Sequence, residues 1–229
     1  MKRTFILRGM AALLACLSLL VSCGKKAYPL TYEDGVFKNE QKEAAFLEAP
    51  LCYRACSALK STTVANISGL RVEDIPLYAI ENADSTLYLT DDSYTLYYSE
   101  SLSLPTLAEM KPYYISLGSP GDNSATELDA LTENEQAQID DLVEILTVGT
   151  SYPAQKLSAY TPESRFELLF LSKEYPAFFY VLEYWKFTDT TTFMDGDQEI
   201  TVKKGVVYDR ATGRFFIMGS ILEDYFINS

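Results

Sequence analysis

The chain has 229 residues, with 19 basic and 32 acidic side chains and a formal net charge of -13. It contains no histidine, which excludes Ser-His-Asp and Cys-His hydrolases, histidine-ligated metal sites and imidazole acid-base catalysis. The acidic balance also argues against a nucleic-acid partner, because phosphates are met by lysine and arginine. Composition therefore narrows the function classes without selecting one.

The first 22 residues have the pattern of a secretory signal. Three basic residues within 1–8 precede an apolar run over 10–21. That run is shorter than the roughly 18 residues needed to cross a bilayer. It ends in Leu20-Val21-Ser22-Cys23, which resembles the bacterial lipobox, the cleavage and lipidation motif of bacterial lipoproteins.

This resemblance implies that signal peptidase removes residues 1–22 and that Cys23 becomes the lipidated N-terminus. Diacylglycerol on the thiol and fatty acids such as palmitate would then anchor the chain, since two or three acyl chains hold a protein firmly. The motif implies export to the outer face of the plasma membrane in a cell with one membrane. In a cell with two membranes it points to the outer membrane, because residue 24 is glycine and not the aspartate that commonly retains lipoproteins on the inner membrane. The alternative is a cleaved secretory signal with an incidental cysteine.

Residues 23–31 are expected to form a lipidated tether to an acidic body. Removing the three basic residues of the signal leaves 16 basic against 32 acidic side chains, a net charge of -16 over the remaining 207 residues. That body would preferentially meet cationic partners.

Two cysteines, Cys52 and Cys56, remain in the exported part. A helical turn would bring their Cα atoms to about 6 Å, within disulfide range, whereas a strand would hold them about 13 Å apart. The alternation in residues 51–57 favours a strand with two free, mostly buried thiols, and the disulfide remains the alternative.

The body is predicted to be α+β, mainly antiparallel sheet, with a β-rich subdomain over 32–118 and an α+β subdomain over 124–229 that together form either one compact domain or two. The Pro- and Gly-containing loop 119–124 marks the boundary. Alternating or Thr- and Tyr-rich runs predict strands at 35–39, 44–47, 62–68, 77–81, 86–90, 94–99, 165–171, 177–187, 199–203, 206–208 and 215–218.

One segment, about 133–147, is predicted to be an amphipathic helix. Thr132 and Glu135 form a capping-box pattern, apolar residues recur at helical spacing, and Gly149 ends the segment. A short terminal helix is expected over 221–227. No phosphate loop, dinucleotide fingerprint or metal-ligand set is present, so the sequence predicts no cofactor.

The longest predicted strand, 177–187, is apolar on both faces. An antiparallel strand with one wet face should alternate apolar and polar residues. The favoured interpretation is a strand covered on both sides. The functional alternative is a ligand groove lined by Tyr184, Trp185 and Phe187.

Two glutamates interrupt these strands. If the hairpin turns about Tyr175, the numbers of paired residues sum to 350 and Glu167 lies opposite Glu183, about 5 Å away. Carboxylates at that spacing suit a retaining glycosidase, whereas a slip of one residue would separate them. Two solvated glutamates are the favoured alternative.

Three functions follow in order of preference. The first is a lipid-anchored, non-catalytic extracytoplasmic domain that binds a protein, peptide or wall component, with a cationic protein as one version. The second is a small-molecule-binding lipoprotein of a transporter. The third is a carboxylate-dependent hydrolase using Glu167 and Glu183.

Overall fold

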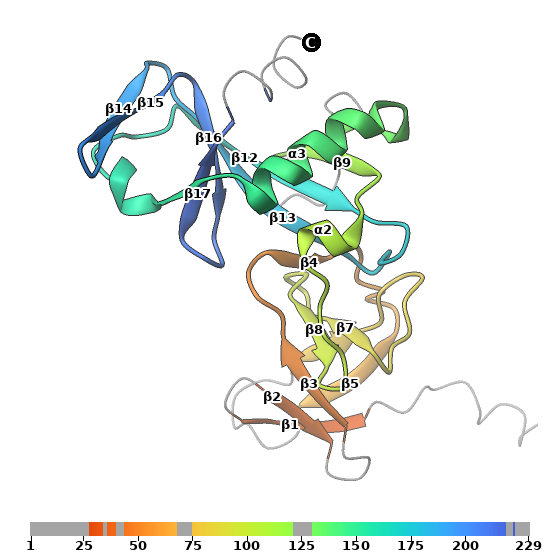
Figure 1. Cartoon of the computed structure of the whole chain (residues 1–229). Helices are drawn as coiled ribbons and strands as arrows, with labels where there is room; N and C mark the ends of the chain where they lie inside the picture. Colours follow the sequence, from red (N-terminus) through yellow and green to blue (C-terminus); the bar gives the residue numbers. More distant parts are fainter. Residues whose placement is uncertain are drawn as a thin grey trace, which may run out of the picture.

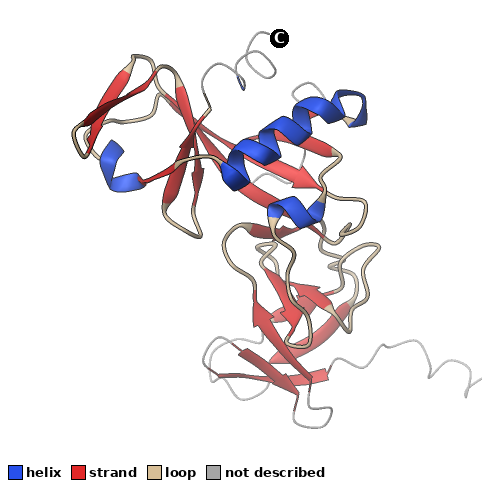
Figure 2. Ribbon diagram, viewed as in Figure 1, coloured by secondary structure: helices blue, strands red, loops and turns tan. Residues whose placement is uncertain are grey.

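The computed structural model describes residues 28–33, 36–39, 44–67, 75–120, 130–218 and 222. The fold is α+β and mostly antiparallel sheet, as the sequence predicts. A small β-barrel forms one end of the molecule, and a larger sheet carries the helices at the other (Figures 1 and 2). We call these parts the barrel unit and the sheet unit.

The barrel unit closes in the strand order β1-β2-β3-β8-β7-β6-β5. Neighbouring strands pair antiparallel except β1 and β5, whose parallel pairing closes the barrel. The strands are β1 (Tyr28–Glu33), β2 (Val36–Asn39), β3 (Ala44–Glu48), β5 (Thr63–Ile67), β6 (Pro76–Tyr78), β7 (Tyr88–Thr90) and β8 (Leu96–Ser99).

Side chains fill the barrel interior, as is usual for barrels this small. Phe37 is 1% exposed, and its ring meets that of Tyr97 edge to face at 4.8 Å. Leu30, Leu77 and Leu89 belong to the same cluster. The described interior of the barrel is therefore a packed core.

The sheet unit has eight strands, seven of them in the order β10-β9-β12-β13-β16-β17-β11. The eighth, β4 (Tyr53–Ala55), leaves the barrel unit and pairs with β13. The other bounds are β9 (Tyr114–Gly118), β10 (Ala130–Leu131), β11 (Ser151–Pro153), β12 (Ser164–Leu171), β13 (Phe178–Lys186), β16 (Gly205–Asp209) and β17 (Arg214–Ile217).

The division between the units differs from the sequence-based one. The loop beginning at residue 119 was expected to separate them, but β9 precedes that loop and pairs with β12 in the sheet unit. The chain thus passes from the barrel unit to the sheet unit after β8, although β4, which precedes β8 in the sequence, already pairs with β13 of the sheet unit. Pairing of strands far apart in sequence decides this boundary, and a local loop signal does not report it.

The helix predicted at 133–147 is confirmed. A 3-10 turn (Glu133–Glu135) leads into α3 (Gln136–Val148). Thr132 and Glu135 form the predicted capping box, with the Thr132 backbone N–H 3.0 Å from the Glu135 carboxylate. The helix ends at Gly149, where the backbone becomes extended, and a Cβ at this position would stand 2.2 Å from the Ile145 carbonyl oxygen, so the position requires glycine.

Two hairpin turns each contain a glycine with positive φ. Gly196, between β14 (Thr191–Asp195) and β15 (Gln198–Val202), has φ +62, and Gly213, between β16 and β17, has φ +66. Both values lie in the left-handed region that favours glycine. The expected terminal helix over 221–227 falls outside the described residues except for residue 222.

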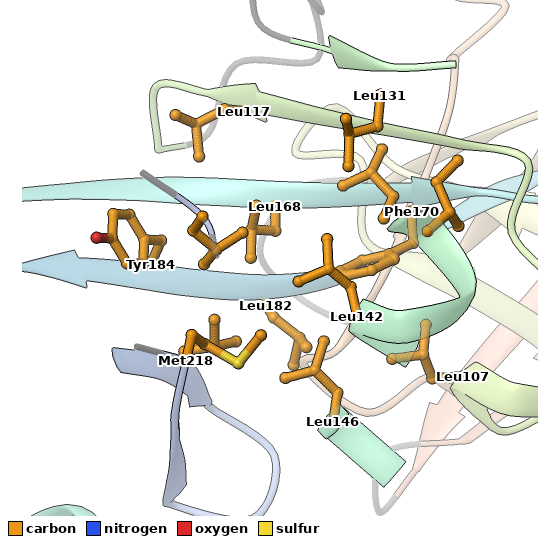
Figure 3. Close-up of a cluster of buried hydrophobic side chains, with 14 residues drawn as sticks. Leu107, Leu117, Leu131, Leu142, Leu146, Leu168, Phe170, Leu182, Tyr184 and Met218 are labelled. Atoms are coloured by element: carbon orange, nitrogen blue, oxygen red, sulfur yellow. The ribbon is translucent and has the colours of Figure 1, made fainter. Parts of the chain in front are cut away.

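Strand β13 is covered on both faces, as the sequence favoured. On its helix-side face, Leu182 and Tyr184 join the cluster under α3 (Figure 3). On the opposite face, which we call the junction face, Phe179 and Val181 pack with Leu169. All nine residues of β13 are buried or half-buried, so this strand is the centre of the sheet unit.

Candidate functional site

The two glutamates singled out from the sequence lie opposite each other on the junction face. Glu167 of β12 pairs in register with Glu183 of β13, in the register predicted from a turn near Tyr175. They are not solvated: Glu167 is 2% exposed and Glu183 is 4% exposed. Two buried, opposed carboxylates need cationic or hydrogen-bonding partners.

Arg54 supplies one of those partners. It lies on β4, opposite Phe179 of β13, and its Nη1 atom donates to Oε2 of Glu167 at 2.5 Å. The arginine side chain is 14% exposed. Because β4 follows directly on the barrel strand β3, this ion pair ties the chain leaving the barrel unit to the middle of the sheet.

Arg210 and Trp185 supply the partners of Glu183. Arg210 follows β16 and forms an ion pair through Nε with Oε1 of Glu183. The indole Nε1 of Trp185 donates to Oε2 of the same carboxylate at 2.6 Å. Both oxygens of Glu183 therefore accept from protein donors.

This arrangement limits what the carboxylates can do chemically. The opposed spacing, about 5 Å between paired side chains, matches that of retaining glycosidases. A general acid must present an O–H to the leaving group, however, and a nucleophile must present an oxygen to the sugar. Glu183 holds both oxygens in contacts with Arg210 and Trp185, so the geometry favours a structural, charge-compensated cluster.

A cavity of about 460 Å³ opens beside this cluster, at the junction of the two units. The sheet unit contributes Glu167, Val181 and Arg210, and β4 contributes Tyr53 and Arg54. The barrel side contributes the end of β3, the residues after it and the turn between β7 and β8: Glu48, Ala49, Leu51, Ser93, Tyr94 and Thr95. We call this the junction cavity.

The charges that line the junction cavity are balanced. Arg54 and Arg210 face Glu48 and Glu167. The volume lies within the roughly 300–1,000 Å³ range of small-molecule pockets. A polar solute that carries both charges, or neither, would suit such a lining better than a strongly charged ion.

The structure does not gather the three predicted groove residues on one surface. Tyr184 is 1% exposed and lies in the helix-side cluster, and Phe187 is 4% exposed in a separate cluster near β14. Trp185 is half-buried, with its ring centroid 4.4 Å from that of Tyr208 and 4.7 Å from the guanidinium carbon of Arg165. Alternation along β13 sends Tyr184 to the opposite side from Trp185.

The two cysteines are free thiols on either side of strand β4, as the sequence favoured over a disulfide. Cys52 is buried and Cys56 is half-buried. Burial raises the pKa of Cys52 to about 11 and that of Cys56 to about 12. Because the thiolate is the reactive form, neither side chain has the character of a catalytic nucleophile.

Sequence reasoning found the two glutamates and missed both arginines. The only available signal for Arg54 and Arg210 is general: a buried carboxylate needs a cationic or hydrogen-bonding partner. Arg54 lies 113 positions from Glu167, and no local pattern links the two. Arg210 sits in an ordinary hairpin turn.

Comparisons with protein-family models, with curated proteins and with solved structures find no match. Among the described residues, no helix is long and apolar enough to span a membrane. The same residues contain no group of three or more cysteine, aspartate and glutamate side chains placed to hold a metal ion. The function has to be argued from this chain's own residues.

Proposed function

We propose that the protein is a lipid-anchored, extracytoplasmic binding protein without catalytic activity, and that its partner is a cationic protein or a wall component. The observation that carries this proposal is the lipobox-like Leu20-Val21-Ser22-Cys23 after a cationic and then apolar segment. Lipid on Cys23 would hold the acidic body at a membrane surface.

The chemistry of the junction face supports the non-catalytic part of the proposal. The only opposed carboxylates suggested by the sequence are engaged by Arg54, Arg210 and Trp185. Such contacts rigidify a site and fix its shape. They suit a scaffold for binding better than a reacting pair.

The charge of the body supports a cationic partner. A net charge of -16 over 207 residues steers positively charged molecules toward the protein and accelerates their association. Salt screens that attraction, with a Debye length of about 8 Å at physiological ionic strength. We therefore expect capture of basic wall-degrading enzymes at low salt and its loss as salt rises.

Metabolic labelling with a fatty acid tests the anchor. The wild-type protein and a Cys16→Ala control, altered only within the signal, should carry label and fractionate with membranes. Cys23→Ala should do neither. A Cys23→Ala protein that still labels and localises normally would contradict the proposal.

A second function, a small-molecule-binding lipoprotein that serves a transporter, is favoured by one observation: the junction cavity lies between two units, where ligand pockets often occur. A solute present at a hundred times its dissociation constant adds about 2.7 kcal/mol to the free energy of unfolding. A thermal-shift screen against amino acids, sugars, peptides and wall fragments would reveal it.

Two variants connect any such stabilisation to the cavity. Leu51 lines it and is 66% exposed, so Leu51→Trp should fill the entrance without disturbing the core. Leu59 is 38% exposed and does not line the cavity, so Leu59→Trp is the matched control. Stabilisation lost in Leu51→Trp alone would favour the transporter role over protein capture.

A further inference from the structure

A second cavity lies on the helix-side face of the sheet. It measures about 340 Å³ and is bounded by the short helix α2 (Leu107–Met110), the C-terminal end of α3, and strands β13, β16 and β17. Its described lining consists of Thr106, Leu107, Ala108, Leu146, Thr147, Tyr180, Leu182, Asp209 and Phe216. We call this the helix-side cleft.

The walls of the cleft are largely aliphatic. Leu107 of α2, Leu146 of α3 and Leu182 of β13 lie along the same edge of the helix-side cluster (Figure 3). Each of the three is less than a tenth exposed. Such walls can accommodate a chain of methylene groups that enters from solvent.

One carboxylate lies among these apolar walls. Asp209 is 8% exposed. Its Oδ1 accepts from the backbone N–H of Ala211 and its Oδ2 from the hydroxyl of Thr212, both at 2.8 Å. Because an ionised carboxylate has about four lone-pair sites, each oxygen can accept another hydrogen bond from a ligand.

No cation balances this carboxylate within the described lining. That lining includes neither lysine nor arginine. Arg214, which pairs in register with Asp209, is directed to Ser151, where it donates through Nε to the hydroxyl and through Nη2 to the carbonyl. The cleft therefore has an uncompensated negative charge, unlike the junction cavity.

The end of α3 adds to the negative potential. Leu146 and Thr147 line the cleft from the last turn of the helix, and that turn contains no basic residue. The C-terminus of a helix carries partial negative charge, which favours cations within the last turn. The helix end and Asp209 thus act in the same direction on a bound ligand.

We infer that the helix-side cleft binds the side chain of a lysine presented by a partner polypeptide, with the methylene groups against Leu107, Leu146 and Leu182 and the ammonium group at Asp209. This inference rests on the proposed capture of a cationic protein and names the site that would do it. Lysine is the choice because its stem is a flexible chain of four methylene groups that suits the aliphatic walls, and it ends in a compact ammonium with three rotatable donors for Asp209.

The test is a titration of the purified protein with the peptide acetyl-Gly-Lys-Gly-amide, followed by the methyl NMR signals of Leu107, Leu146 and Leu182. These signals should shift in a saturable way. The same peptide with norleucine in place of lysine keeps the methylene chain and lacks the charge, so it should produce no saturable shift.

Asp209→Asn removes the charge and keeps both turn contacts, since the amide oxygen still accepts from Ala211 and the amide N–H can donate to Thr212. We expect affinity for the lysine peptide to fall at least about tenfold, which equals about 1.4 kcal/mol. Asp197→Asn, in the exposed turn between β14 and β15, changes the net charge equally and should leave affinity unchanged. Ala108→Phe, at an exposed position of the lining, should block the cleft and abolish the shifts.

Three results would overturn the inference: equal shifts with the norleucine peptide, equal losses in Asp209→Asn and Asp197→Asn, or binding of free pentylamine without binding of the lysine peptide. These results leave the lipid anchor untouched, because labelling of Cys23 is measured independently. Salt-sensitive capture of a basic enzyme that survives in Asp209→Asn would likewise contradict the cleft and retain the proposed function.

Discussion

The two faces of β13 differ in how the carboxylates on them are neutralised. On the helix-side face, Leu182 and Tyr184 are buried among apolar neighbours, and Asp209, the one carboxylate of the described cleft lining, has no basic residue beside it in that lining. On the junction face, Glu167 and Glu183 are buried and each is paired with an arginine. Compensated charges organise a structure, whereas an uncompensated one is available to a ligand.

This difference shows why a buried carboxylate is weak evidence for catalysis by itself. A carboxylate pair at glycosidase spacing was the most attractive catalytic motif of the sequence. Its partners turn it into a polar cluster that holds β4 against the sheet. The number of donors around each oxygen separates the two interpretations, and only the folded structure supplies that number.

The largest effect expected is from breaking the compensation on the junction face. Arg54→Met leaves Glu167 buried without that ion pair, so the free energy of unfolding should fall by about 3–5 kcal/mol. Arg54→Met combined with Glu167→Leu removes both charges and should recover most of the loss. Denaturant unfolding measures both variants. A double variant as unstable as the single one would mean that lost packing, rather than the unpaired charge, causes the effect.

The matching change on the helix-side face is Leu182→Ala. Leu182 is 3% exposed, and truncation of such a leucine typically costs about 2–5 kcal/mol through lost burial and the cavity left behind. Removal of a charge elsewhere should not recover this lost stability, whereas Glu167→Leu should recover most of the stability lost in Arg54→Met. If Leu182→Ala lowers the free energy of unfolding by less than about 1 kcal/mol, the cluster under α3 is loosely packed.

Alkaline pH should destabilise the protein because the thiols of Cys52 and Cys56 are buried or half-buried beside β13 and resist ionisation in the folded chain. Burial raises the pKa of Cys52 from 9.0 to about 11 and that of Cys56 from 9.0 to about 12. Above pH 9 the unfolded chain releases these protons while the folded chain keeps them, so the free energy of unfolding decreases as pH rises. We expect a loss on the order of 2 kcal/mol between pH 9 and 11 from Cys52.

Cys52→Ala isolates that contribution, because the variant lacks the thiol and keeps the tyrosines that titrate in the same range. Its stability should decline less steeply than that of the wild type. Equal slopes in both proteins, measured by denaturant unfolding at a series of pH values, would show that the Cys52 thiol titrates alike in the folded and unfolded chains.

The smallest effect expected concerns the fluorescence of Trp185, the only tryptophan. Its ring is half-buried against Tyr208, and its N–H is bonded to Glu183. Emission should lie to the blue of free indole in water, with weak quenching by iodide. Emission at the position of free indole, with ready quenching, would contradict a covered junction face.

The sequence predicted those features that depend on local chemistry. Thr132, Glu135 and Gly149 identify α3 because caps act within a single turn. The 167–183 register followed from the position of the hairpin turn. Features that join distant segments were not predictable in this way: the parallel pairing of Tyr28 with Ala65 that closes the barrel, and the ion pair of Arg54 with Glu167, involve no neighbouring residues.

The aromatic groove illustrates the remaining gap. Tyr184, Trp185 and Phe187 are close in sequence, but alternation along β13 places Tyr184 in the cluster under α3, whereas Trp185 packs against the separate cluster that contains Phe187. The helix-side cleft, in contrast, assembles residues from α2, α3, β13, β16 and β17. No window of sequence contains enough of it to indicate a site.

The proposed binding function requires that Glu167 and Glu183 serve structure and do not react with a substrate. The most direct measurement is incubation of the purified protein with wall glycans and peptides, followed by mass spectrometry of the solutes. We predict that every solute is recovered unchanged with the wild type and with Glu183→Gln alike. Conversion by the wild type that disappears in Glu183→Gln would contradict the account and identify the glutamate pair as a catalytic site.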